Sequence, residues 1–135
     1  MGTTQPIREK EKLRLFLQYY QTELPSERNL ALLAIGTYTA LRISDILALR
    51  WQDIYDFSQK RYKEHLFIQE KKTGKRTIIA INPKLSQILE HYRLTRTPAH
   101  TDFVFTKETD YNKPLSRSQA FRIIKKAAEN TLHEE

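Results

Sequence analysis

The run of six apolar residues from Leu30 to Ile35 constrains the fold of this chain most strongly. No polar position interrupts it, so a helix formed by this run has to be covered by other elements on every side. Ala34 and the adjacent Gly36 are small enough to let a neighbouring helix approach closely. Ser26 precedes the run as a predicted N-cap. The sequence therefore predicts a buried central helix over residues 30–40, with other helices packed around it.

Helical spacing of apolar residues recurs before and after this run, and one segment alternates instead. The predicted elements are a helix from Pro6 to Leu24, a short helix over 43–49 capped by Ser44, two strands around 66–68 and 79–81, a helix starting at Asn82–Pro83, a short buried segment over 103–105 and a last helix capped by Ser116. On the last helix, the predicted inner face comprises Ala120, Phe121, Ile124, Ala127 and Ala128. The fold class is α+β and mostly helical, with helices around one small antiparallel β-hairpin.

Charge and composition narrow the classes of partner. The 135 residues include 23 Lys and Arg against 16 Asp and Glu, a formal net charge of +7. Such a balance favours a polyanionic partner, and nucleic acid is a commoner one than a membrane. There is no cysteine, and the histidines show no metal-ligand spacing, so we expect no metal and no cofactor. No apolar run is long enough to cross a membrane, so we expect a cytoplasmic protein without a membrane partner or a small-molecule substrate.

Residues 39–54, TALRISDILALRWQDI, place one arginine inside an otherwise apolar helical pattern. Burying such a charge is costly unless an anion meets it, and phosphate suits the always-charged, multi-donor guanidinium of Arg42. The alternative is structural: Arg42 could pair with Asp45, three residues on, for a few tenths of a kcal/mol.

Residues 69–76, QEKKTGKR, lie between the two predicted strands, with Gly74 suited to a turn. A lysine in such a turn is usually only a solvated charge. A hairpin tip could also insert an ammonium group beside an oxygen of a bound nucleic acid.

Together these two segments resemble the first half of a tyrosine recombinase (phage integrase family) catalytic domain. The resemblance implies that Arg42 holds the scissile phosphate, that Asp45 supports it without doing chemistry, and that Lys72, directly before Thr-Gly, is the general acid. It also implies phosphoryl transfer on DNA through a 3′-phosphotyrosine, without metal or nucleotide, with arginines stabilising charge on the phosphate.

Further basic and polar residues are candidates for contacts to the DNA backbone. A helix N-terminus favours phosphate, which points to the start of the last helix. The alternative is an ordinary N-cap followed by a solvated basic face. The predicted DNA-binding residues are Arg50, Lys71, Lys75, Arg76, Ser116, Arg117, Gln119, Arg122 and Lys125.

The resemblance extends from Pro6 to the end of the sequence, and residues 1–5 are expected to be a disordered end or tag remnant. The family's His-x-x-Arg box and nucleophilic tyrosine have no match here, so we expect residues 6–135 to be a partial catalytic domain, inactive alone. The longer parent is expected to recombine or integrate DNA and to self-associate on it. We also expect uncovered apolar surface on the 30–35 helix and around Phe121 and Ile124. The alternatives are a non-catalytic DNA-binding or regulatory protein that retains this half of the fold, and a helical interaction module.

Overall fold

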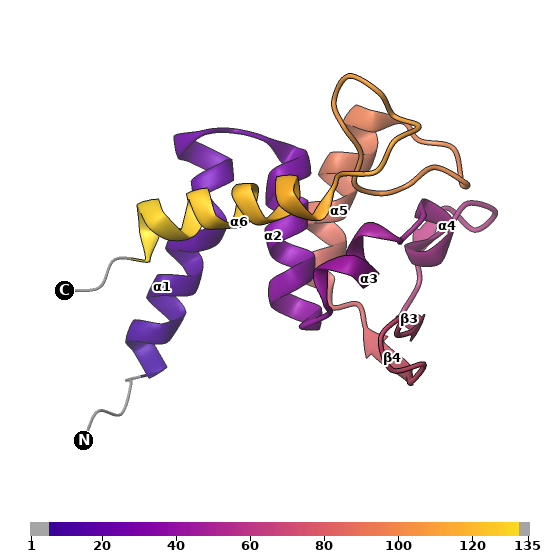
Figure 1. The fold of residues 1–135 in the computed structure, drawn as a ribbon, viewed down its shortest axis with the longest axis horizontal. Coiled ribbons are helices and arrows are strands. Elements are labelled where there is room, and N and C mark those ends of the chain that lie inside the picture. Colours follow the sequence, from indigo (N-terminus) through magenta and orange to yellow (C-terminus); the bar gives the residue numbers. More distant parts are fainter. Residues whose placement is uncertain (1–5, 133–135) are drawn as a thin grey trace.

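The computed structural model describes residues 6–132, so the prediction for residues 1–5 lies outside the described residues. Figure 1 shows helices packed around α2, with a β-hairpin at one end of the assembly. The elements in chain order are α1 (Pro6–Gln18), the π-helical turn η1 (Tyr19–Glu23), α2 (Glu27–Thr39), α3 (Ile43–Leu47), α4 (Trp51–Ile54), β1 (Tyr55–Asp56), β2 (Arg61–Tyr62), β3 (His65–Gln69), β4 (Arg76–Ala80), α5 (Pro83–Arg96) and α6 (Arg117–Thr131).

The central helix is confirmed as α2. Ser26 caps it by accepting a hydrogen bond from the amide of Asn29 at 3.1 Å, and Ala40 ends it in the left-handed conformation. All six residues from Leu30 to Ile35 are buried, because α5 runs along α2 while α1 and α6 pack against it. The expectation of uncovered apolar surface on this helix is therefore wrong.

The hydrophobic core has two parts. The larger part joins α2 to α3, α4, α5 and the segment before α6, with Trp51 and Phe105 fully buried. The smaller part lies where η1 meets α2 and α6, around Tyr20 and Leu33. The predicted buried segment over 103–105 supplies Val104 and Phe105, and its backbone pairs with Leu49 and Leu115 at 3.0 Å.

The predicted β-hairpin is confirmed, and its register pairs His65 with Ala80 and Gln69 with Arg76. A second two-stranded sheet, β1 with β2, was not predicted. Its strands have two residues each, too few for an alternating pattern in the sequence. A tight turn joins them, in which the Asp56 carboxylate accepts hydrogen bonds from the Ser58 and Gln59 amides.

Several details of the predicted helices were wrong. The helix predicted from Pro6 to Leu24 is α-helical only to Gln18 and continues as the π-helical turn η1. The helix predicted over 43–49 ends at Leu47, and the short α4 that follows was not predicted. The N-cap of α3 is Arg42, not Ser44, because Arg42 has extended backbone angles and the helix begins at Ile43.

On α6, Ala120 and Ala127 are buried as predicted, but Phe121 is 51% exposed. The inward positions follow the spacing 120, 123, 124 and 127, and Phe121 lies beside that stripe. The exposure of Phe121 agrees with the uncovered apolar surface expected there, but Ile124 is half-buried against the smaller core, so that expectation is wrong for Ile124.

Across residues 6–132, none of the helices combines the length and apolar character that crossing a bilayer requires.

Candidate nucleic-acid interface

Arg42 lies at the junction between α2 and α3. The left-handed Ala40 ends α2, and its amide donates to the Gly36 carbonyl at 3.0 Å. The chain then extends through Arg42, whose side chain is exposed at the start of α3. Within the described residues Arg42 forms no ion pair with Asp45 within 4.0 Å. The structural alternative to a phosphate contact thus lacks the pairing on which it depends.

Asp45 connects α3 to the hairpin instead. Its side chain is only 4% exposed, and Oδ1 accepts a hydrogen bond from the Lys71 amide at 3.3 Å. Oδ2 is buried and has no hydrogen-bond partner among the described residues. The Lys71 amide belongs to the residue just before Lys72, so this bond holds the base of the β3–β4 turn against the helix that Arg42 begins.

Residues 70–75 form the turn of the hairpin. The Glu70 amide donates to the Lys75 carbonyl at 2.8 Å, and the Gly74 amide donates to the Glu70 carbonyl at 2.7 Å. Gly74 has a φ of 72°, a conformation that costs glycine little. Lys72 lies in this turn with an exposed side chain.

The Glu70 carboxylate braces the turn, a role that the sequence did not reveal. It accepts hydrogen bonds from the hydroxyls of Thr77 at 3.0 Å and Thr73 at 3.2 Å. These bonds, with smaller contributions from the charges of Arg42 and Lys75, hold the pKa of Glu70 below its ordinary value of 4.5. The available signal was a pair of threonines three and seven residues after the acidic residue. The Glu70 charge is thus part of the surroundings of Arg42.

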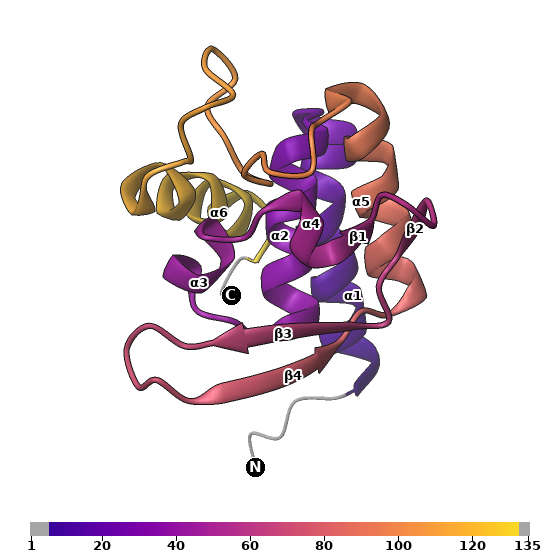
Figure 2. The ribbon, with the colours of Figure 1, turned by 90° about the vertical axis from the view of Figure 1, so that its right-hand side faces the viewer.

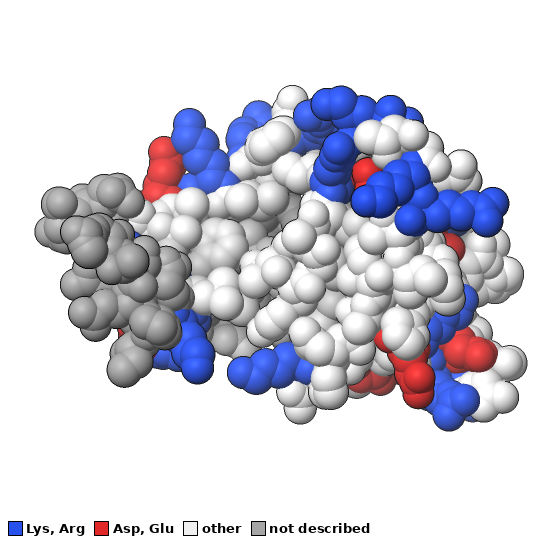
Figure 3. All heavy atoms as spheres, turned by 90° about the horizontal axis from the view of Figure 1, so that it is seen from below, with Lys and Arg blue, Asp and Glu red and all other residues white. Residues whose placement is uncertain are grey.

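The basic residues of the hairpin and of α6 are exposed and lie on one side of the molecule. In Figure 2, the hairpin turn, α3 and α6 all lie toward the left. The same side forms the upper edge of Figure 3, where Lys and Arg side chains gather while the middle of that face is mostly uncharged. The exposed basic residues among the predicted set are Lys71, Lys75, Arg76, Arg117, Arg122 and Lys125.

Other predicted contacts are already occupied within the chain. Ser116 and Gln119 form a capping box. The Ser116 hydroxyl accepts a hydrogen bond from the Gln119 amide at 3.1 Å, and Gln119 Oε1 accepts one from the Ser116 amide at 3.0 Å. Arg50 donates from Nη1 to the Thr101 carbonyl at 2.6 Å and lies over the Phe103 ring at 4.1 Å. A DNA contact through these side chains would have to replace those interactions. We therefore do not group them with the exposed basic residues.

Three tyrosines have surroundings that oppose activation of the hydroxyl. Tyr20 donates to the Ile123 carbonyl and Tyr92 to the Val104 carbonyl, both at 2.7 Å. Burial raises the pKa of Tyr20, Tyr62 and Tyr92 above the ordinary value of 10, the opposite direction from an activated nucleophile.

Comparison with known proteins extends this description. The sequence model of the phage integrase family matches residues 7–134. "Probable integrase/recombinase YoeC" of Bacillus subtilis (strain 168) is 38% identical over 128 residues, which are 95% of this chain and 65% of that protein. This chain thus spans a little under two thirds of its relative's length.

Solved structures share the fold. The crystal structure of XerA recombinase has a TM-score of 0.71 at 15% identity and covers 93% of this chain and 43% of that one. Lambda integrase bound to DNA gives 0.66 at 15% identity, with 92% and 42% covered. The Tn1549 transposon integrase in complex with transposon right end DNA gives 0.59 at 22% identity, with 97% and 46% covered. At these identities the likeness concerns the fold alone.

Proposed function

Because the chain belongs to the phage integrase family, we propose that it forms the part of a tyrosine recombinase catalytic domain that binds duplex DNA and presents Arg42 and Lys72 to the scissile phosphate. The observation that carries this proposal is the hydrogen bond from the Lys71 amide to Asp45. It ties the turn bearing Lys72 to the helix capped by Arg42, which supports the proposal that one phosphate meets both side chains.

In the proposed reaction, a tyrosine hydroxyl gives up its proton to a general base of the longer polypeptide or to water, and its oxygen attacks the scissile phosphorus as the bond to the 5′ oxygen breaks. Arg42 donates N–H groups to the non-bridging oxygens, where negative charge builds up. Lys72 gives a proton to the departing 5′ oxygen, which leaves as a hydroxyl. Attack by a 5′-hydroxyl of another strand on the 3′-phosphotyrosine reverses the step and joins the DNA. The sum is strand exchange with no net loss of phosphodiester bonds.

The tyrosine, and the His-x-x-Arg box expected from the resemblance, are proposed to act from a longer polypeptide. The committed hydroxyls of Tyr20 and Tyr92 support this assignment. Residues 6–135 then contribute binding and charge stabilisation, and are inactive in cleavage by themselves. A DNA substrate implies action in the cytoplasm.

Self-association on DNA is part of the proposal. One solved structure of the same fold is a lambda integrase dimer bound to a core site, at a TM-score of 0.65. Strand exchange needs two DNA ends held together, so we expect the longer polypeptide to assemble on its site.

The first test measures binding of this chain to a labelled duplex by fluorescence anisotropy. Affinity should fall steeply between about 50 and 200 mM salt, by roughly 0.9 log units per log unit of salt for each phosphate contacted. Lys75→Glu with Arg76→Glu, on the hairpin, should weaken binding and flatten this slope. The matched control reverses two exposed lysines at the β1–β2 turn and the start of α5, Lys60→Glu with Lys84→Glu, on the right side of Figure 2.

Binding that ignores salt, or equal losses in the two double variants, would contradict the proposed interface. Covalent capture then separates the two DNA-binding alternatives. A longer polypeptide that includes the family tyrosine should give a protein–DNA adduct on a suicide substrate. A non-catalytic DNA-binding protein would bind the same duplex and give none.

A further inference from the structure

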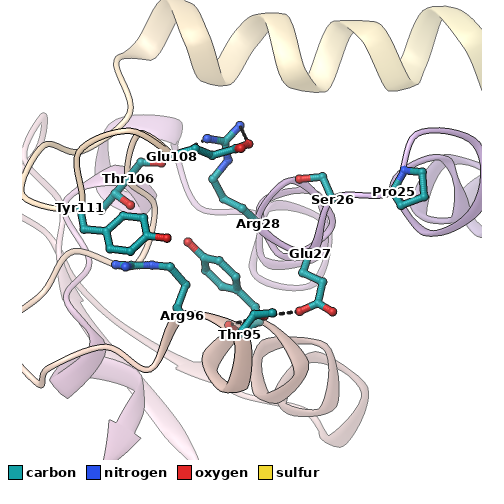
Figure 4. A pocket seen from close by; sticks show the side chains of 10 residues that line it. Pro25, Ser26, Glu27, Arg28, Thr95, Arg96, Thr106, Glu108 and Tyr111 are labelled. Carbon is teal, nitrogen blue, oxygen red and sulfur yellow. Dashed lines mark hydrogen bonds and ion pairs between the residues drawn. The ribbon is translucent and has the colours of Figure 1, made fainter.

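A cavity of about 470 Å³ lies at the end of α2 opposite to Arg42 (Figure 4). The first turn of α2, the last turn of α5 and the loop between α5 and α6 form its walls. A helix of thirteen residues is about 20 Å long, so the cavity is well separated from the start of α3. Nothing in the proposed DNA chemistry uses it.

The unusual wall residue is Arg96, the last residue of α5. Only 9% of it is exposed. Its Nε and Nη2 are buried without a hydrogen-bond partner, and the guanidinium forms no ion pair within 4.0 Å among residues 6–132. The Tyr111 ring covers it, 3.7 Å from Cζ to the ring centroid. An unpaired buried charge is costly, and a cation–π contact offsets only part of that cost.

The other arginine of the cavity is satisfied. Arg28 donates to Asn29 Oδ1 at 2.9 Å and to the Thr106 carbonyl at 3.3 Å, and it pairs with Glu108 at 3.5 Å. Arg96 is therefore the cation of this cavity that has no acidic partner within 4.0 Å among the described residues. The N-terminus of α2, which lines the same cavity, adds further positive potential.

We propose that this cavity binds a small molecule with a single carboxylate, held side-on by Nε and Nη2 of Arg96. These two nitrogens lie on the same edge of the planar guanidinium, where two parallel N–H groups match the two oxygens of a carboxylate. The volume lies within the range of about 300–1,000 Å³ typical of ligand sites.

Charges at the rim select the class of anion. The exposed Glu27, which accepts a hydrogen bond from Thr95, and the exposed Glu108 both line the cavity. They repel a dianion such as phosphate, and a DNA backbone, more than they repel a monoanion. The half-exposed Tyr111 lies over Arg96 in Figure 4, so its ring has to swing aside as the carboxylate enters. The Tyr92 and Tyr111 rings favour an aromatic carboxylate as the probe.

The test follows the Arg96 Nε–H signal by NMR in arginine-labelled protein during titration with sodium benzoate. Benzoate should give a saturable shift of this signal, and benzamide, a neutral molecule of nearly the same shape, should give none. Inorganic phosphate and a short duplex serve as the other anions. Arg96→Met should weaken benzoate binding, followed through ligand-observed NMR, by at least about tenfold, since one partner of a charged pair is lost.

Arg61→Met is the matched control, because it removes an exposed arginine of β2 that does not line the cavity, and it should leave benzoate affinity unchanged. If Arg96→Met does not fold, Tyr111→Ala provides the second variant. It uncovers the Arg96 guanidinium and should therefore change the affinity for benzoate, while benzamide should still produce no shift of the Arg96 signal. The proposal is overturned if benzoate produces no saturable shift, or if benzamide or phosphate matches it. A shift of Arg96 by duplex DNA at least as strong would assign the cavity to nucleic acid instead.

Discussion

Arg42 presents an exposed guanidinium at the first turn of α3, beside a hairpin that carries the Glu70 carboxylate. Its surroundings differ from those of the buried Arg96 and of Arg50, whose guanidinium is bound to a carbonyl. Of these three arginines, Arg42 is the one that is exposed and also forms no hydrogen bond to another described residue, so it can reach an external phosphate directly. Its contribution is therefore expected in catalysis and not in folding.

The Arg42→Ala substitution separates these two contributions. In this chain, the free energy of unfolding should change by no more than about 0.5 kcal/mol, because an exposed side chain without an ion pair is removed. In a longer polypeptide that cleaves DNA, the cleavage rate should fall on the order of a hundredfold or more, while duplex affinity changes far less. Arg42→Lys should be nearly as slow, since an ammonium lacks the planar fork. Parallel losses of affinity and cleavage would indicate a binding role only.

A change of the leaving group distinguishes Lys72 from its neighbours Lys71 and Lys75 as the general acid. Replacing the 5′ oxygen with sulfur gives a thiolate leaving group, whose conjugate acid has a pKa of about 8.5 and needs little protonation. Lys72→Ala in the longer polypeptide should be slow on normal DNA and recover on the sulfur substrate. Lys71→Ala and Lys75→Ala should show no such recovery. Recovery by Lys75→Ala would move the general acid along the turn.

At the scale of elements, the contact between α3 and the hairpin rests on one hydrogen bond. Asp45→Ala should increase hydrogen exchange at the Lys71 amide, because its acceptor is removed. The free energy of unfolding should change less than the loss of a buried hydrogen bond would suggest, about 1–3 kcal/mol, because the unpartnered Oδ2 is removed as well. Asp53→Ala is the control, since it removes the acceptor of the Arg50 amide on α4. Unchanged exchange at Lys71 would contradict the tether.

The hairpin turn should also respond to pH through Glu70. Its lowered pKa means that the ionised carboxylate stabilises the folded turn above the ordinary value of 4.5, and this stabilisation is lost as the pH falls through the folded pKa. Thr77→Val removes the largest contribution, so the pKa of Glu70, followed by NMR titration, should rise toward 4.5. Thr131→Val, whose hydroxyl bonds the Ala127 carbonyl on α6, should leave it unchanged. If the pKa of Glu70 falls in the Thr77→Val variant, the Thr77 hydroxyl is not what lowers it.

Capping residues and periodicity predicted most of the elements. Ser26, Asn82 and Ser116 each accept the backbone hydrogen bond expected of an N-cap. The alternation of apolar residues around 66–68 and 79–81 predicted the two strands of the β3–β4 hairpin. Ser44 was wrong because the start of α3 depends on the left-handed Ala40, and a left-handed alanine has no signature in the sequence.

The candidate site was less predictable than the fold. Arg42 and Asp45 were identified in one recognisable stretch of the sequence, 39–54, and Lys72 in a second, 69–76. The bracing of the turn by Glu70 depends instead on a hairpin register that brings together residues seven apart. The isolation of Arg96 depends on which acids fail to lie near it, and no local pattern encodes that.

At the scale of the whole molecule, apolar surface remains on the hairpin. Phe67 and Ile78 are cross-strand partners on its outer face, 70% and 65% exposed. Both hairpin edges also lack a further strand within the described residues. This combination favours association through the hairpin.

The double substitution Phe67→Thr with Ile78→Thr tests that expectation. It places β-branched residues suited to strands at both positions and should reduce the apparent mass in sedimentation velocity at high protein concentration, with little loss of folding stability. Phe121→Thr, on α6, is the matched control for an exposed aromatic outside the hairpin. If the control lowers the mass and the double variant does not, self-association runs through α6.

The burial of Trp51 has an optical consequence. It is the single tryptophan of the chain, it is fully buried, and its ring centroid lies 5.6 Å from that of Tyr92, a wall of the Arg96 cavity. Its fluorescence therefore comes from one environment, at the meeting point of α4 and α5. A red shift of the emission marks the entry of water into that core, and a change in intensity without a shift reports rearrangement around Tyr92. The protein thus carries its own spectroscopic probe, and no label has to be attached.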